Sequence, residues 1–136
     1  SSPFYVRRIM PDNRTVTIVS SAALGTTTPS TPVASHGARG IIIYMEVTAV
    51  SGTSPTLDSK VQGYDALGDV WHDITGAVFA QKTGAGSDYL TIYPGIGETA
   101  NEAVSDVIPA LIRVHNTIGG SSTPTVTFSL GGVFIP

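Results

Sequence analysis

The 136-residue chain contains no cysteine, which excludes disulfides, a thiolate nucleophile and a zinc–thiolate site. Charge is also scarce, because only 12% of residues are charged, about half the usual globular share. Thr, Ser and Gly fill the difference. So few charges suggest that part of the surface is covered by other subunits.

Other features that would indicate a nucleic-acid or membrane partner are missing. The net charge is −3, and the arginines are dispersed except for Arg7 and Arg8, so there is no basic stripe that tracks phosphates. The longest apolar run, residues 41–50, is shorter than the roughly 20 residues of a membrane helix and includes Glu46. We therefore expect neither nucleic acid nor membrane as a partner.

The hydrophobic residues present are sufficient for a folded domain. They make up 41% of the chain, and the mean hydropathy is +0.21. A chain of this length and composition can bury a core as one ordinary domain.

The best-defined feature is an approximate internal repeat, in which the pattern of residues 41–63 recurs at residues 110–132. Both copies read as an apolar strand, a Gly/Ser/Thr loop, Pro-Thr and a second alternating strand. Aligned pairs include Thr48 with Thr117 and Pro55 with Pro124. We interpret each copy as a β-hairpin, built from scaffold residues rather than reactive groups.

Apolar residues alternate with polar ones through most of the chain, which is typical of strands with one buried face. Residues 41–50 have apolar odd positions and predict the central strand. Short strands separated by turns indicate a sandwich or barrel. The fold class is therefore all-β, an antiparallel β-sandwich or jelly-roll-like barrel, with further strands at residues 57–64, 70–74, 78–82, 89–93, 111–116 and 123–130.

The first 38 residues have a different character. Residues 4–10 and 15–20, joined by a turn at 11–13, predict an N-terminal hairpin that packs on the core or on a neighbour. Residues 25–38 contain almost no large apolar side chain and predict an extended loop that faces solvent or clasps a partner. We divide the chain into this arm and loop, residues 1–38, and a sandwich domain, residues 39–136.

A helix is indicated only at residues 98–107, where Ala100, Ala103, Val104 and Val107 recur at helical spacing before Pro109. Thr, Asn, Val and Ser are weak helix formers, which counts against it.

Chemical motifs are weak throughout. His72 and Asp73 are adjacent in a strand and so point to opposite faces, and Ser121 lies in no nucleophile elbow. Asp65, Asp69 and Asp73 do not follow the ligand order of a calcium loop. The Gly-rich stretch 95–100 lacks a βαβ context. We predict no catalytic, cofactor-binding or metal site, and no enzyme activity.

Aromatic residues offer one alternative. Tyr64, Trp71, Tyr89 and Tyr93 can form a platform for a sugar ring, with Tyr64 and Trp71 as its centre. The competing interpretation, which we favour, is core or subunit contact.

Several short motifs from residue 40 to residue 132 resemble small β-sandwich virion proteins encoded among the head genes of tailed bacteriophages. These are V-x-G-x-D at 61–65, W-x-D-I at 71–74, Y-P-G-I at 93–96, S-D-V-I-P at 105–109 and I-R-V at 112–114. The resemblance excludes the N-terminal third and rests on scaffold residues.

The resemblance implies a capsid decoration or cement protein on the phage head surface, assembled in the host cytoplasm, often as a homotrimer. Its partners would be the major capsid protein and copies of itself. Candidate contacts are Phe4, Tyr5, Arg7, Arg8, Thr28, Pro29 and Pro32. The alternatives are a carbohydrate-binding or receptor-binding fibre module, and a tail-tube or tail-completion protein.

Overall fold

The computed structural model describes residues 13–136, and within this range the chain is all-β with no helix. This confirms the predicted fold class. The strands, in chain order, are β1 (Arg14–Leu24), β2 (Thr28–Pro29), β3 (Val33–Ala34), β4 (Gly40–Asp65), β5 (Val70–Val78), β6 (Gly86–Ile92), β7 (Ala103–Val104) and β8 (Leu111–Ile135).

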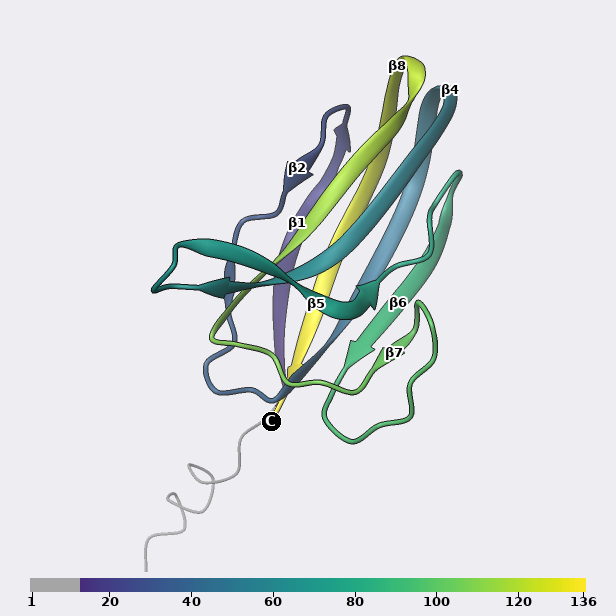
Figure 1. The fold of residues 1–136 in the computed structure, drawn as a ribbon. Helices are drawn as coiled ribbons and strands as arrows, with labels where there is room; N and C mark the ends of the chain where they lie inside the picture. Colours follow the sequence, from purple (N-terminus) through teal and green to yellow (C-terminus); the bar gives the residue numbers. More distant parts are fainter. Residues whose placement is uncertain (1–12) are drawn as a thin grey trace, which may run out of the picture.

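The two longest strands, β4 and β8, form one antiparallel ladder that continues through a sharp bend (Figure 1). Pairing runs from Gly40 with Ile135 to Gly63 with Ile112, and the register is irregular only between residues 47 and 56 of β4. Positive φ angles concentrate at the bend, where the backbone must turn sharply. They occur at Gly52, Ser54, Gly120, Ser122 and Thr123.

Folding this two-stranded ribbon over itself produces two facing layers (Figure 1). Layer A consists of β1, residues 125–135 of β8, residues 40–51 of β4, β6 and the short parallel strand β7. Layer B consists of β2 and β3, residues 111–119 of β8, residues 56–65 of β4, and β5. This is a jelly-roll-like sandwich.

The two copies of the internal repeat form a different structure from the predicted pair of hairpins. Each copy is a single strand that crosses from one layer to the other, and the two copies pair with each other rather than each forming its own hairpin. Thr53 and Ser122, which the alignment of the copies makes equivalent, meet at the bend with their hydroxyl oxygens 3.2 Å apart. The hairpin interpretation was therefore wrong, while the strands within it were correct.

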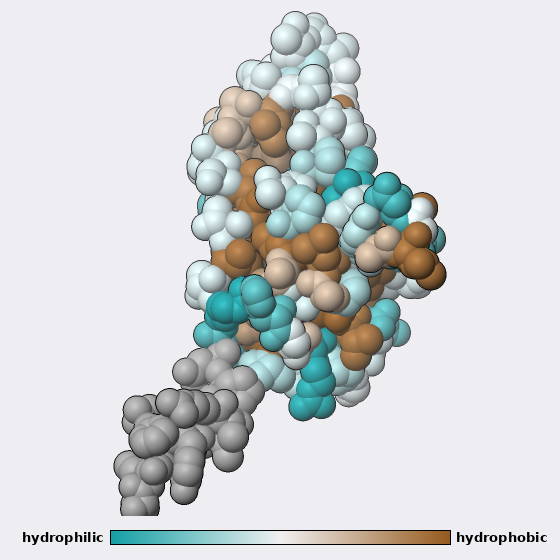
Figure 2. All heavy atoms as spheres, turned by 90° about the vertical axis from the view of Figure 1, so that its left-hand side faces the viewer, coloured by the Kyte–Doolittle hydropathy of each residue, from teal (hydrophilic) through white to brown (hydrophobic). Residues whose placement is uncertain are grey.

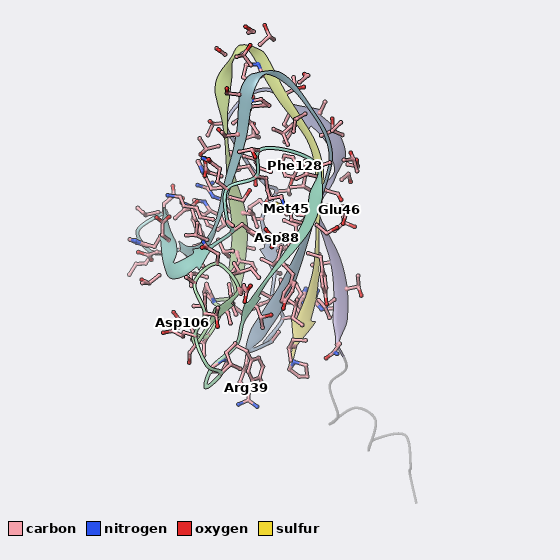
Figure 3. All side chains as sticks on the ribbon, turned by 90° about the vertical axis from the view of Figure 1, so that its right-hand side faces the viewer. Arg39, Met45, Glu46, Asp88, Asp106 and Phe128 are labelled. Carbon is pink, nitrogen blue, oxygen red and sulfur yellow. The ribbon has the colours of Figure 1, made fainter. Side chains whose placement is uncertain are left out.

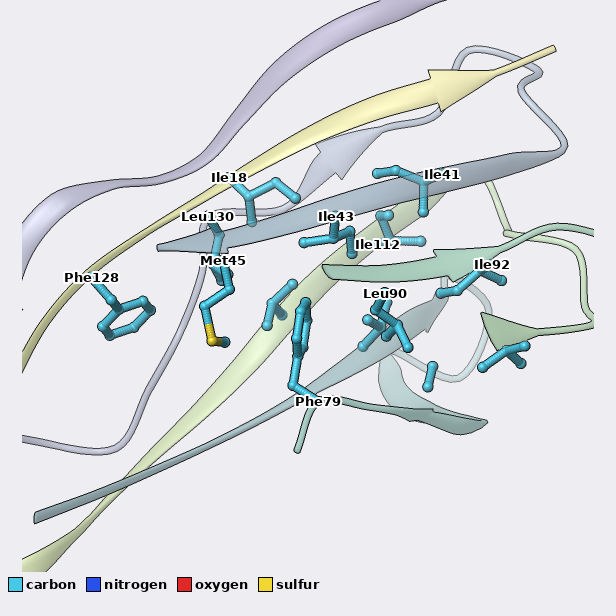
Figure 4. Packing of buried hydrophobic residues seen from close by; sticks show 14 of the residues in the cluster. Ile18, Ile41, Ile43, Met45, Phe79, Leu90, Ile92, Ile112, Phe128 and Leu130 are labelled. Atoms are coloured by element: carbon cyan, nitrogen blue, oxygen red, sulfur yellow. The ribbon is translucent and has the colours of Figure 1, made fainter. Parts of the chain in front are cut away.

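The core lies between the layers and comes from the alternating positions of the long strands (Figure 4). In β4 the odd positions from Ile41 to Val47 are buried as predicted, but Ala49 is exposed. In β8 and β6 the predicted inward residues are buried. The cluster's largest fully buried side chains include Phe79, Phe128, Phe134, Ile41, Ile43, Met45, Leu57, Leu90, Ile92, Ile112 and Leu130.

Two predicted elements differ from the structure. Residues 98–107 form no helix; they make a turn with Asn101 at positive φ and then β7, because Thr91 and Tyr93 of the β6 segment hydrogen-bond to Glu102 and Val104. Sheet pairing outweighs the weak helical spacing. In residues 78–82 only Val78 belongs to a strand, although Lys82 still exchanges two backbone hydrogen bonds with Leu57.

The predicted extended loop lies along layer B. It contains β2 and β3, which pair with β8, and it buries Ser30 and Ser35. Residues 15–20 belong to β1, which pairs with β8 in layer A and places Ile18 in the core. Residues 4–10 lie outside the described residues, so the N-terminal hairpin and the division at residue 38 stay predictions.

Candidate functional site

The outer face of layer A is almost free of charge. Read across four strands, one row is Thr15, Val133, Ile42 and Thr91, and the next is Thr17, Gly131, Tyr44 and Tyr89. The next row contains Ser129, Glu46 and Ser87. Three further residues of β8 face the same way, namely Thr125, Thr127 and Ile135. Glu46 is the one residue among these that is charged at neutral pH.

Two exposed tyrosines stand at the centre of this face. Tyr44 and Tyr89 are directly opposite in the ladder, with ring centroids 6.4 Å apart, and each is 51% exposed. Gly131, beside Tyr44, leaves open space where a side chain would stand. Glu46 points outward, away from the buried Met45 and Phe128 (Figure 3), and accepts hydrogen bonds from the Ser87 hydroxyl.

The outer face of layer B has the opposite character. The Arg113 Nε donates to Gln62 Oε1 at 2.8 Å, and the Gln62 Nε2 donates to Asp73 Oδ1 at 2.9 Å. The Lys60 Nζ reaches Asp73 at 3.0 Å. The Gln62 and Lys60 hydrogen bonds hold the pKa of Asp73 below its usual value of 3.8. Each charged side chain of this network therefore has a hydrogen-bond partner within it.

The structure brings Tyr64 and Trp71 together, as the alternative glycan hypothesis requires. They are cross-strand partners with ring centroids 4.9 Å apart. The Arg113 guanidinium, however, lies 4.4 Å from the centre of the Trp71 ring and covers one of its faces. The Tyr64 hydroxyl donates to Asp69 at 2.6 Å, and this bond raises the pKa of Tyr64. Tyr89 and Tyr93 are not part of this cluster, because Tyr89 lies in layer A and Tyr93 hydrogen-bonds to Pro136.

The predicted inter-subunit residues are only partly described. Phe4, Tyr5, Arg7 and Arg8 lie outside the described residues. Thr28 and Pro29 form β2 against Asn116 and His115, and Pro32 is exposed between β2 and β3. These three positions stay predicted contacts.

An open groove of about 490 Å³ separates β1 from β2 at the edge of the sandwich. Figure 2 shows apolar surface in the middle of this side, bordered by polar residues. Its apolar lining comes from Ile18, Val19, Leu24 and Pro29, and its polar lining includes Asn116.

The three turn carboxylates considered for a cation each have protein partners. Asp65 accepts hydrogen bonds from the backbone amides of Leu67 and Gly68, while Asp69 and Asp73 are bound as described above. Within residues 13–136 no three His, Cys, Asp or Glu side chains form a group that could hold a metal ion. No helix in that range is long and apolar enough to cross a membrane.

Sequence reasoning missed the charge-poor face of layer A. The signal was present in the alternation, since the outward positions of these strands are mostly Thr, Ser, Gly and Tyr. Assigning them to one face required the register between β1, β8, β4 and β6, which no single strand reveals.

Comparison with known proteins adds little. No family model matches the chain, and no curated protein matches it. A chain in the structure of infectious bursal disease virus Gx strain has 13% sequence identity and a TM-score of 0.48. The match covers 92% of this chain and 32% of that one, about a third of its length. A similarity with a TM-score below 0.5 does not assign a function to this chain. The resemblance to tailed-phage virion proteins therefore stays a prediction.

Proposed function

We propose that the protein is a non-enzymatic structural subunit of a virion, a capsid decoration or cement protein that binds the outer head surface of a tailed phage. The main observation behind this proposal is the composition of the outer face of layer A. The core of a subunit interface is depleted of charged residues and enriched in Tyr, and this face combines two exposed tyrosines with a single charged residue.

The fold supports the proposal by analogy. Double-layered jelly rolls occur in viral capsid domains, but also in lectins and cupins, so the architecture alone does not select a function. The difference between the two faces indicates which of them binds a partner. Layer B keeps its charges in an internal network suited to solvent, while layer A presents a surface with little to repel a partner.

Such a subunit needs no reactive group. Its affinity would come from summed apolar contact and hydrogen bonds over an interface of about 1,600 Å² or more. Tyr44 and Tyr89 would supply the aromatic anchors. Further predicted contacts would extend the interface beyond layer A, namely Phe4, Tyr5, Arg7, Arg8, Thr28, Pro29 and Pro32.

Co-sedimentation with undecorated phage capsids tests the proposal. Gly131→Lys places a charge at the centre of the layer A face, where the structure leaves open space. Thr117→Lys places the same charge on the exposed outer face of layer B and serves as the matched control. We expect saturable binding by the wild-type protein and by Thr117→Lys, and at least ~10-fold weaker binding by Gly131→Lys.

Wild-type protein that stays in the supernatant would overturn the capsid-binding role. Equal loss of binding by both lysine variants would show a general effect of charge rather than a layer A interface. Unfolding curves for the three proteins should coincide, because both sites are open to solvent.

Glycan binding is the second candidate function, and the pairing of Tyr64 with Trp71 favours it. It predicts that the isolated protein binds immobilised glycans and that Trp71→Ala loses this binding. Tyr44→Ala is the matched control, because it removes an exposed aromatic ring from the other layer. Failure of the wild-type protein to bind any glycan would eliminate this candidate.

A further inference from the structure

A pocket of about 300 Å³ opens at the end of the sandwich where β1 begins and β8 ends. One side is apolar and the other cationic. Its wall includes a tight turn in which Ala38 N–H donates to the Ser35 carbonyl and the residues between them have positive φ. The lining residues are Arg14, Ser35, His36, Gly37, Ala38, Arg39, Phe134 and Pro136.

Arg14 is held rigidly in this pocket. Its Nη2 donates to the carbonyl oxygens of Ala34 and Ser35 at 3.0 and 2.9 Å, and its guanidinium lies 4.5 Å from the centre of the Phe134 ring. These contacts use one nitrogen and leave the other N–H groups for a further acceptor. A guanidinium fixed in this way loses little side-chain entropy when it binds a carboxylate.

The two arginines of the pocket have no carboxylate partner among residues 13–136. Of the other three described Lys and Arg residues, Lys60 pairs with Asp73 and Lys82 with Asp88. Arg113, like the pocket arginines, has no carboxylate partner among the described residues, but it lies in the layer B network against Gln62 and Trp71. Within residues 13–136, neither Arg14 nor Arg39 has a carboxylate within 4.0 Å. Two positive charges that no carboxylate of the described residues pairs with therefore share one pocket, in a protein of net charge −3.

The complementary charge lies on the segment that precedes β8. Residues 83–112 contain no Lys or Arg, and Glu98, Glu102 and Asp106 are all exposed. Glu98 accepts a hydrogen bond from the backbone amide of Ser105, and Asp106 accepts one from that of Val107; within the described part of the chain neither carboxylate meets a cation. Val107, next to Asp106, is 55% exposed despite being apolar.

Both surfaces lie toward the same end of the molecule but do not neutralise each other within one chain. Figure 3 shows Arg39 projecting outward from this end and Asp106 in the same lower part of the molecule. The Ile108 N–H donates to the Arg39 carbonyl at 3.3 Å, which fixes the acidic segment beside the pocket. In that position its carboxylates remain more than 4.0 Å from both guanidiniums.

We propose that the arginine pocket of one copy binds the acidic segment, residues 98–106, of a second copy. The Asp106 carboxylate would meet the guanidiniums, while Val107 packs against the partly exposed Ala38 and Pro136 of the pocket wall. A nucleic acid fits less well, because its phosphates need an extended basic track and this surface is otherwise acidic. The inference rests on the proposed function, in which copies assemble on a shell.

Pocket and segment are different surfaces, so the contact is either head-to-tail, which builds rings, or reciprocal, which builds a dimer. Analytical ultracentrifugation of the full chain measures the association. Arg39→Gln removes one pocket charge from an exposed side chain, and Lys60→Gln removes one charge from the outer face of layer B as a matched control. We expect Arg39→Gln to weaken self-association ~10-fold and Lys60→Gln to leave it unchanged.

A mixing experiment identifies the partners. Arg39→Gln keeps its acidic segment, and the variant Glu98→Gln/Glu102→Gln/Asp106→Asn keeps its pocket. Each alone should associate weakly, while a mixture should form 1:1 pairs through the one intact junction. Self-association that is insensitive to Arg39→Gln, or variants that do not complement each other, would overturn the proposal.

Capsid co-sedimentation of Arg39→Gln separates this inference from the proposed function. Wild-type protein that binds capsids but does not self-associate would overturn only the copy-to-copy contact. Capsid binding that is lost in Arg39→Gln while the wild type stays monomeric would assign the pocket to an acidic segment of the capsid instead. Absence of capsid binding by the wild type would remove the proposed function itself.

Discussion

Neighbouring glycines in β8 have opposite roles, and alanine substitutions should reveal them. A Cβ on Gly132 would lie 3.0 to 3.1 Å from methyl groups of Ile41, Ile18 and Val16, whereas a Cβ on Gly131 would meet open space. We expect Gly132→Ala to lower the free energy of unfolding by about 1–3 kcal/mol through overpacking. Gly131→Ala should be neutral or slightly stabilising. Urea denaturation measures both, and equal effects would contradict this account.

One buried polar pair interrupts the core. The Ser59 hydroxyl donates to Asn116 Oδ1 at 2.7 Å, and Asn116 Nδ2 donates to the Thr28 carbonyl at 3.3 Å. We expect Asn116→Ala to destabilise the fold by about 1–3 kcal/mol, because it leaves buried polar groups without partners. The double variant Ser59→Ala/Asn116→Leu should recover part of this loss in thermal unfolding. A double variant less stable than Asn116→Ala would show that the pair cannot be replaced by apolar packing.

Asp73 gives the stability a small dependence on acid pH. Its pKa in the folded state is below the ordinary value of 3.8, so the native state binds its proton less readily than the unfolded state. The stabilisation is present above pH 3.8 and is lost as the pH falls through the lower folded-state pKa. Because Asp73 is exposed to solvent, salt should reduce the effect. Asp73→Asn should flatten this part of the stability–pH curve, and a curve identical to the wild type's would contradict the assignment.

At the scale of elements, the bend of the folded ribbon can be locked covalently. Thr53 and Ser122 face each other there, and the chain has no cysteine to compete in oxidation. Thr53→Cys/Ser122→Cys should form a disulfide that stabilises the fold by about 2–4 kcal/mol, because the closed loop is long. Unfolding with and without reductant measures the gain. Two free thiols under oxidising conditions would show that the copies do not meet as described.

Strand positions could be predicted from alternation, but strand partners could not. Residues 41–50 alternate because one face is buried, and this holds whichever strand pairs with them. The internal repeat therefore indicated two equivalent strands without showing that they pair with each other. The prediction of a helix at 98–107 was wrong for a related reason. Val104 is buried by sheet contacts that the local spacing of apolar residues does not reveal. The layer A face and the arginine pocket depend on the same missing register.

At the scale of the whole molecule, the two proposed contacts should differ in their response to salt. The layer A face contains one charged residue, so its binding depends on apolar and hydrogen-bond contacts that salt screens little. The arginine pocket depends on charge, and Coulomb attraction between exposed groups falls as the Debye length shrinks from about 14 Å at 0.05 M salt to about 4 Å at 0.5 M. Raising NaCl over this range should therefore weaken self-association several-fold and capsid co-sedimentation much less, because only the predicted Arg7 and Arg8 contacts add positive charge to that interface. Equal weakening of both would show that the two contacts share one charged interface, and self-association unaffected by salt would show that charge does not hold the copies together.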